Sequence, residues 1–231
     1  KAYMQNVGGD RNTAMGYSAL KNYTEAGAGS NVALGMYAMN LHETGTLNVA
    51  VGYYSMSATG STTNSRNIAI GAHTLYASSG TSDNTAVGND AGRTITTGSY
   101  NTLMGSYAGD SITIGSRNTI IGQAAGQSLT VENYNTHVGE RAGHNSNGGS
   151  YCTFLGYLAG YNNDGGYNTF IGANAGQSAN TQYQSVFIGN EAGYGSSSSG
   201  YDNVVIGRQA GYAMTSAHSS VMIGAGAGKA S

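Results

Sequence analysis

One five-residue motif recurs along the chain at nearly constant spacing. It consists of a small polar residue, a Thr or other β-branched residue, a variable residue, an aliphatic residue and Gly, from residues 12–16 to residues 220–224. There are thirteen copies, and most successive motif glycines are 17 residues apart. A period this short means that each copy is one supersecondary unit that buries apolar side chains only by stacking on its neighbours. The repeat therefore predicts a solenoid.

The four residues before each Gly predict a short β-strand, because successive side chains of a strand point to opposite faces. The second and fourth positions share one face and are β-branched or aliphatic in nearly every copy, as in Thr119 and Ile121. We expect these two positions to fill each coil, with Ile121, Ile171 and Ile188 as structural residues. The predicted fold is all-β, a parallel β-solenoid or β-roll of about thirteen 17-residue repeats.

The third position points to the opposite face of the same strand. It is Ala in the first five copies and mostly larger and apolar afterwards, including Phe154, Phe170 and Phe187. A strand that is apolar on both faces is expected where both faces are covered, and a neighbouring copy of the chain is the simplest cover for a solenoid. We therefore expect three chains, intertwined or packed along this column as a homotrimeric rod.

The turn residues change type part-way along the chain. A Gly fixed at a strand end marks a backbone position with positive φ or with no room for a Cβ atom. The residue four positions after this Gly is Leu or Met in the first four copies and Gly in the later ones. We expect a lead-in or truncated end over residues 1–10 and one solenoid over residues 11–231, with a Leu/Met subtype over 11–79, an Ala-Gly subtype over 80–231 and the change near 80–92. The predicted structural glycines are Gly88, Gly105, Gly122, Gly139, Gly156, Gly172 and Gly189.

Asn opens ten of the thirteen copies. Stacked Asn amides can donate and accept hydrogen bonds from coil to coil, so this column predicts a ladder. Cys152 is the only cysteine, which leaves no internal disulfide and makes stacking the source of rigidity.

Charge and hydropathy exclude two classes of partner. Only 9% of the residues are charged and the formal net charge is −2, so nothing draws the chain to nucleic acid. No apolar run approaches the roughly 20 residues that span a bilayer, so we expect no membrane insertion.

Two early repeats carry a family resemblance. Residues 31–39 read Asn-Val-Ala-Leu-Gly-Met-Tyr-Ala-Met, and residues 48–56 read Asn-Val-Ala-Val-Gly-Tyr-Tyr-Ser-Met. They resemble the Asn-Val-Ala-Ile-Gly repeats of bacteriophage tail-fibre proteins and are similar to the head repeats of trimeric autotransporter adhesins, over about residues 11–228. The resemblance implies a trimeric left-handed β-roll or related solenoid on a virion tail fibre or an extracellular surface, where it engages a host-cell receptor, glycan or protein.

Catalytic motifs fail on inspection. Residues 224–230 imitate a phosphate-binding loop, but Ile223 replaces its first Gly and Ala230 replaces the Ser or Thr that binds magnesium. We expect no enzyme activity, no cofactor and no metal. His137 is the one exception to consider, because a three-fold axis along the third position would bring three imidazoles together around a metal or anion. An interchain hydrogen bond or solvent contact is the alternative for His137.

Tyrosine is the favoured aromatic residue, with eighteen Tyr against three Phe. An apolar ring with a polar tip suits contact with sugars and proteins, but such rings can equally stack on one another as an outer ladder. The candidate binding residues flank the turns: Tyr134, Tyr151, Tyr161, Tyr167, Tyr194 and Tyr201.

Three functions remain open. We favour a non-enzymatic fibre segment that displays loops for host attachment. An ice-binding solenoid is the first alternative, suggested by a run of Thr in the second position, and it requires inside and outside to be exchanged relative to our assignment. A polysaccharide-degrading tailspike is the second, and it rests on fold analogy alone. The Thr run is Thr85, Thr102, Thr119, Thr136, Thr153 and Thr169.

Overall fold

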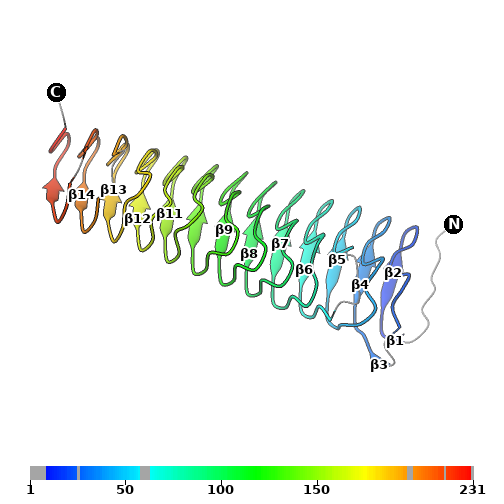
Figure 1. Ribbon diagram of the computed structural model, residues 1–231. Helices are drawn as coiled ribbons and strands as arrows, with labels where there is room; N and C mark the ends of the chain where they lie inside the picture. The colour runs from blue at the N-terminus through cyan, green and yellow to red at the C-terminus, as the bar shows by residue number, and fades with distance from the viewer. Residues whose placement is uncertain (1–8, 25–26, 58–62, 197–199, 216, 230–231) are drawn as a thin grey trace. The chain divides into compact units, whose positions relative to one another are not determined.

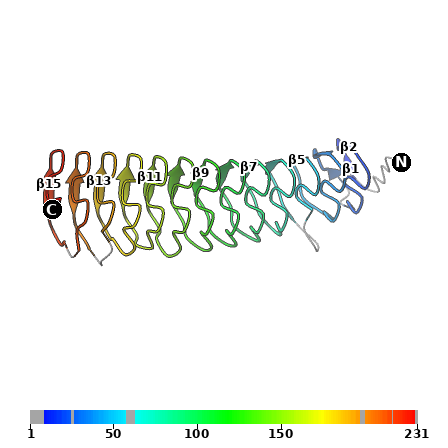
Figure 2. The same ribbon diagram turned by 90° about the horizontal axis from the view of Figure 1, so that it is seen from above.

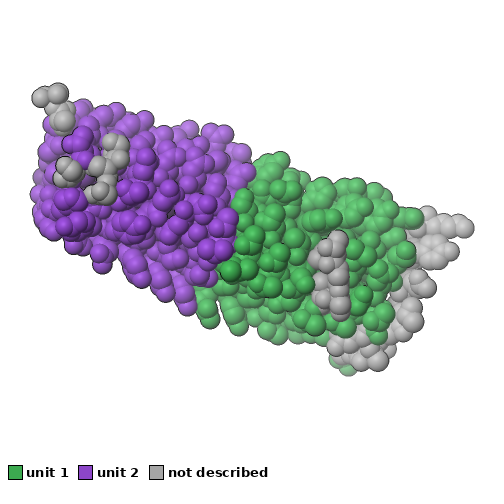
Figure 3. Space-filling model, in the orientation of Figure 1, with its two compact units in different colours: residues 1–117 green, residues 118–231 purple. Residues whose placement is uncertain are grey.

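The chain is all-β over the residues that the structure describes. The computed structural model describes residues 9–24, 27–57, 63–196, 200–215 and 217–229, so residues 1–8 of the expected lead-in lie outside the described residues. These residues form short strands joined by turns, and no helix long and apolar enough to cross a membrane occurs among them. They divide into two compact units, residues 1–117 and 118–231, coloured separately in Figure 3.

The first unit contains eight strands. They are β1 (Gly9–Asp10), β2 (Thr13–Met15), β3 (Gly27–Ala28), β4 (Val32–Leu34), β5 (Val49–Val51), β6 (Ile68–Ile70), β7 (Thr85–Val87) and β8 (Thr102–Met104). The second unit contains seven, which are β9 (Thr119–Ile121), β10 (Thr136–Val138), β11 (Thr153–Leu155), β12 (Thr169–Ile171), β13 (Val186–Ile188), β14 (Val204–Ile206) and β15 (Val221–Ile223).

Each motif copy supplies one three-residue strand, and equivalent residues pair in parallel. In the first unit, β2 and β4 to β8 form a ladder, as in the register Ala50↔Ala69, while β1 and β3 pair separately. In the second unit, β9 to β15 form a ladder with the same register, as in Phe154↔Phe170. Figures 1 and 2 show the strands of each unit side by side along one wall of the coils. The predicted parallel β-solenoid is confirmed.

The coil interior is the reverse of the sequence prediction. The middle strand residue, which is the third motif position, is fully buried inside the coil in β4 to β14, including Phe154, Phe170 and Phe187. The second and fourth positions flank it and face outward, so Ile121, Ile171 and Ile188 are only partly buried within the chain. The expectation that Thr, Val and Ile fill the coil while the Ala-to-Phe column meets a neighbouring chain was wrong.

The physical reason lies in the length of the strand. A three-residue strand turns one side chain toward one face and two toward the other. The other walls of the coil also contribute buried side chains, so the narrow interior has space for only one side chain from the strand. That side chain is the middle residue. The Asn column shares the parity of the middle residue, and Asn31 and Asn48 are fully buried. The position of the Asn column therefore marks the inward face of each strand.

Two opposing columns of side chains fill the interior, and where the residue in one column is large the residue in the other is small. In the early coils Ala33 and Ala50 lie in the middle position, while Met39 and Met56 are fully buried at the fourth residue after the motif Gly. From β8 onward the larger residue is in the strand and the opposing position is Gly, whereas the coil of β7 has Ala86 and Gly92 at these positions and buries Ile95 beside them. A Cβ atom built on Gly160 would lie 2.6 Å from the Phe154 ring. The subtype change seen in the sequence is thus a transfer of bulk from one wall to the other.

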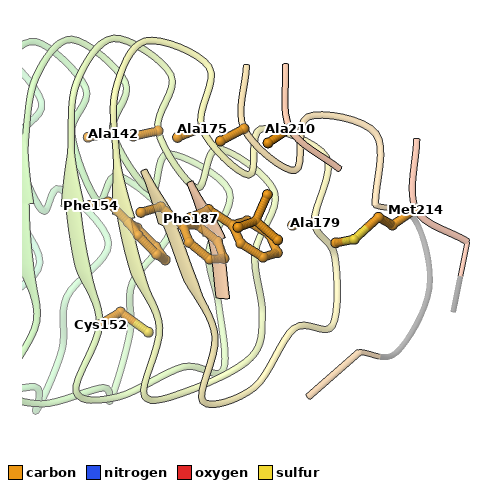
Figure 4. Packing of buried hydrophobic residues seen from close by; sticks show 12 residues of the cluster. Ala142, Cys152, Phe154, Ala175, Ala179, Phe187, Ala210 and Met214 are labelled. Atoms are coloured by element: carbon orange, nitrogen blue, oxygen red, sulfur yellow. The ribbon is translucent and has the colours of Figure 1, made fainter. Parts of the chain in front are cut away.

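The three phenylalanines form a continuous interior stack in the second unit. Ring centroids lie 5.1 Å apart for Phe154–Phe170 and 4.6 Å apart for Phe170–Phe187, with interplanar angles of 19° and 7°. Figure 4 shows the rings of Phe154 and Phe187 pointing into the coil, with small alanines such as Ala175 to one side of them. Such stacked apolar rings are a large part of the buried area that holds these coils together.

The Asn ladder expected from the sequence is present. The backbone N–H and the side-chain amide of Asn48 both donate to Oδ1 of Asn31, at 2.9 and 3.1 Å, and Asn67 makes the same pair of bonds to Asn48. At the break in the column, the Cys152 backbone N–H donates to Asn135 Oδ1 at 2.9 Å and its thiol donates to the Gly165 carbonyl. The ladder satisfies buried polar groups that the narrow interior hides from water.

The motif glycines have both properties that favour Gly. Gly156 has φ +138°, and a Cβ atom built there would lie 2.6 Å from the carbonyl oxygen of Gly172 in the next coil. The other predicted structural glycines, such as Gly88 and Gly139, have a similar positive φ and face the next coil in the same way. Any side chain at these positions would separate adjacent coils.

The volume exchange predicts different costs for two glycine substitutions with similar backbone strain. Gly160 and Gly226 have φ +60° and +67°, but a Cβ atom meets Phe154 at Gly160 and nothing within 4 Å at Gly226. Gly226→Ala should cost about 1 kcal/mol from strain, and Gly160→Ala about 1–3 kcal/mol more from overpacking. Denaturant unfolding of both variants measures the loss in free energy of unfolding. Equal losses would contradict the exchange, and adding Phe154→Leu should recover part of the Gly160→Ala loss.

Candidate interaction surface

In each unit, the first and last residues of the motif strands form a surface that we call the outer strand face. These are the second and fourth motif positions, and they point away from the buried middle residue. In the middle of the first unit Ile68 and Ile70 are each 40% exposed, and in the second unit Leu155 is 44% exposed. Large aliphatic side chains are thus left on the surface of consecutive coils.

The outer strand face has no charged side chain in any of its positions. Its residues are Thr, Val, Ile, Leu and Met, and the strand backbone groups beneath them are used in the parallel ladders. Soluble proteins rarely expose contiguous apolar areas without a use, and such areas typically mark interaction sites. The sequence analysis missed this surface because it placed these residues inside. The parity of the Asn column was the signal that could have found it.

Threonine occupies the first strand position in the middle copies. Thr85 and Thr102 lie on the outer strand face of the first unit, and Thr119, Thr136, Thr153 and Thr169 lie on that of the second. Their side chains are half-buried, except that of Thr136, which is exposed. Inside and outside are therefore exchanged in the sense that the ice-binding alternative required.

The six candidate tyrosines lie in outer ladders instead of forming one site. Tyr134, Tyr151 and Tyr167 stack in sequence with centroids 4.9 and 5.0 Å apart and nearly parallel rings. Tyr194 stacks on Tyr212 at 5.1 Å. These pairs use ring faces for coil-to-coil stacking, and Tyr134, Tyr151 and Tyr167 remain 44%, 48% and 61% exposed.

The other two candidates stack on histidine. Tyr161 pairs with His144 at 5.1 Å, and Tyr201 pairs with His218 at 4.3 Å. Both pairs belong to the second unit, as do the tyrosine stacks. The ladder alternative considered for these tyrosines is therefore present in the structure, and their role in binding remains a prediction.

His137 lies inside the coil and not on a surface that a three-fold axis could reach. It is fully buried and stacks on Phe154 with centroids 4.6 Å apart, and neither ring nitrogen has a hydrogen-bond partner among the described residues. Burial lowers the pKa of His137 to about 3, so the imidazole is neutral at pH 7. The hypothesis that three such imidazoles meet around a metal or anion was wrong, because the side chain faces its own coil.

No group of three or more His, Cys, Asp or Glu side chains that could hold a metal ion occurs among the described residues. The carboxylates that lie near each other are joined through arginine. Arg93 Nε lies 2.8 Å from Asp110 Oδ1 and 3.7 Å from Asp90 Oδ1. Burial raises the pKa of the Cys152 thiol to about 11, which keeps it protonated and weakly nucleophilic.

Comparison with protein-family models, curated proteins and solved structures finds no match for this chain. The similarity to tail-fibre and adhesin-head repeats consequently rests on the repeat motif alone. What the outer strand face and the turns do must be argued from their chemistry.

The buried imidazole of His137 predicts acid-sensitive stability. Because the folded pKa of about 3 lies below the ordinary value of 6.5, the unfolded chain binds an extra proton between these values and stability falls as pH drops below 6.5. At pH 5 this amounts to about 2 kcal/mol. The stability gain of His137→Phe over the unaltered chain should therefore grow as pH falls from 7 to 5, measured by denaturant unfolding. Both proteins keep His42, whose pKa burial also lowers, so the difference isolates His137. A gain that is constant with pH would contradict the prediction.

Proposed function

We propose that this chain is a non-enzymatic structural and adhesive fibre segment that assembles as a homotrimer through the outer strand face and presents its turns for attachment to a host cell. The observation that carries the proposal is the uncharged, partly exposed apolar surface repeated on the motif strands of both units, β2 and β4 to β15. Burial of one Val- or Ile-sized side chain contributes roughly 1.5–3 kcal/mol, so even partial cover of many such residues supports a stable assembly.

The repeat spacing favours a second copy of this chain as the occupant. Strands in each ladder lie side by side in strict register, so outward residues recur at the inter-strand spacing of about 4.8 Å. A partner that contacts residue after residue along this surface must repeat at the same spacing. Another copy of the solenoid has this property by construction, whereas an ordinary globular surface does not.

The number of outward columns favours a ring of three chains. Each strand presents two outward residues, such as Val186 and Ile188, on either side of the inward Phe187. In a closed ring every chain has two neighbours, so each neighbour can cover one column, and three is the smallest ring that provides two neighbours. The trimer thus keeps the assembly expected from the sequence but forms it through the two columns that the sequence analysis had placed inside.

The location of the fibre is proposed from the motif resemblance. The Asn-Val-Ala-Leu-Gly copy at residues 31–35 resembles repeats of phage tail fibres and adhesin heads, which act on virions or at extracellular surfaces. The structure supports the compatible parts of this proposal, namely a repeating coil with tyrosine-rich turns and an uncharged outer strand face. Its host-cell receptor would then be a glycan or a protein.

A charge on the outer strand face should disrupt the assembly. Ile70→Asp places a carboxylate at a 40% exposed position in β6, and Ile114→Asp makes the same change at a 55% exposed position outside the strands. Light scattering should give three times the mass of one chain for the unaltered protein and for Ile114→Asp, and a smaller mass for Ile70→Asp, because burying an unpaired charge is costly. A single-chain mass for the unaltered protein would overturn the trimer, and equal masses for all three proteins would remove the outer strand face from the interface.

Ice binding is the second candidate, because the Thr column does face outward. Ice is another partner with a regular repeat, which could match the regular spacing of residues on a parallel ladder. Each Thr offers it a methyl group and a hydroxyl group at a constant spacing. The aliphatic residues that share the face, and the Val and Ile that replace Thr in β4 to β6 and β13 to β15, favour self-association instead.

Thermal hysteresis separates the two candidates. Our proposal predicts none, because trimer formation covers the outer strand face. The ice-binding candidate predicts hysteresis that Thr136→Lys abolishes and that Gln123→Lys, at another exposed site but outside the strands, leaves intact. Nanolitre osmometry of the three proteins provides the measurement, and hysteresis with this pattern would replace the fibre proposal.

A further inference from the structure

An open cleft of about 300 Å³ lies in the turns of the first unit, away from the strand residues that form the outer strand face. It is lined by Tyr54, His73, Tyr76, Asp90 and Arg93, none of which was selected from the sequence. The volume is at the lower end of small-molecule sites, which suits a single ring-sized group.

The cleft arises where two turn columns change composition at neighbouring coils. The residue two positions after the motif Gly is aromatic in successive coils until a carboxylate interrupts it, and the residue five positions after this Gly changes from aromatic to charged. The first column reads Tyr37, Tyr54, His73, Asp90 and Tyr107, and the second reads Tyr76, Arg93 and Asp110.

The backbone fixes the first column firmly. Tyr54, His73 and Asp90 all have positive φ, between 53° and 55°. Their backbone N–H groups each donate to a carbonyl of the preceding coil, at 3.1, 2.9 and 3.0 Å. The positions of the three side chains are therefore set by the ladder and not by a loose loop.

One side of the cleft is aromatic. Tyr54 and His73 stack with centroids 5.9 Å apart, and Tyr76 lies edge-on to both at 6.1 and 6.0 Å. The three rings thus form a triangle with nearly equal sides. The rings are apolar and their hydroxyl or nitrogen atoms are polar, so this wall offers both apolar and polar contacts to a ring-sized ligand.

The other side is charged but nearly balanced. Asp90 is only 14% exposed, and its Oδ1 lies 3.7 Å from both His73 Nδ1 and Arg93 Nε, beyond hydrogen-bond range. The Arg93 guanidinium is bound instead by Asp110, at 2.8 Å from Nε. Asp90 Oδ1 is left as an acceptor facing the cleft, with an arginine donor beside it.

We propose that this cleft binds one neutral saccharide ring. A pyranose has apolar C–H faces and a rim of hydroxyl groups that both donate and accept hydrogen bonds. The tyrosine wall matches the apolar face. Asp90 accepts from hydroxyl groups and Arg93 donates to them, and hydrogen bonds to charged groups are the stronger kind.

Charged ligands fit less well. An anion would compete with Asp110 for Arg93 and would face the Asp90 carboxylate. A cation would meet the Arg93 guanidinium, which stays charged because the hydrogen bond that it donates to Asp110 raises its pKa. The aromatic wall does not overcome this repulsion, since Tyr54 already uses one ring face on Tyr37 at 4.6 Å.

This inference deepens the attachment part of the proposed function, since it names the ligand class and the place where it binds. It rests on the proposal that the turns engage a host surface, but not on the trimer. The two proposals can fail separately. A monomer that binds sugar would support the saccharide site and contradict the trimer. A trimer that binds no sugar would support the trimer and contradict the saccharide site.

The test uses saturation-transfer difference NMR on the full chain with methyl glycosides of glucose, galactose, mannose, rhamnose and N-acetylglucosamine. We expect at least one glycoside to bind, and Tyr76→Ala and Asp90→Asn to weaken it about tenfold or more. The matched controls are Tyr157→Ala, an exposed tyrosine of the second unit, and Asp83→Asn, a carboxylate paired with Arg66 at 2.7 Å outside the cleft. Both controls should bind as the unaltered chain does.

Three outcomes would overturn the proposal. The first is no binding of any glycoside, and the second is equal loss in the controls. The third is binding of methyl sulfate or tetramethylammonium, but of no glycoside, that depends on Asp90. Light scattering and thermal unfolding of every variant check that a loss of binding reflects the cleft and not the assembly or the fold.

Discussion

The narrow interior of the coil is the constraint on which the rest of the structure depends. Between its walls there is room for only one or two large side chains per coil, as with Leu103 and Ile112, and the residues that share this space adjust to one another. Ala33 lies in a coil with Met39, whereas Phe154 lies opposite Gly160, where even a Cβ atom would collide with the ring. Close packing of this kind leaves each strand only one inward position, and the two residues beside it must face outward.

That division explains why an apolar surface exists at all. The strand needs β-branched and aliphatic residues for its parallel ladder, and two of its three side chains, as in Val186 and Ile188, remain outside the coil. Polar residues could have filled these positions if the surface faced only water. The persistence of Ile, Val, Leu, Met and Thr is the physical basis for proposing that other copies of the chain cover it.

Much of the fold could be predicted from the sequence. The spacing of the motif glycines predicted the coils, the residues before them predicted the strands, and the Asn column predicted a ladder that the bonds from Asn48 to Asn31 confirm. The prediction of which strand face points into the coil was wrong, because β-branched residues suit either face of a parallel strand. The cleft around Asp90 could not be predicted, since Tyr76 and Arg93 come together only through the turn geometry of neighbouring coils.

The second residue after the motif Gly has a backbone held by the ladder, and in most coils its side chain is at least partly exposed. Across the coils this position holds residues as different as Tyr54, Asp90, Arg141 and Leu158, all with φ between 53° and 55°. Its side chain can be exchanged while the neighbouring interior columns stay the same. Recognition in such a chain can thus evolve one coil at a time, independently of folding.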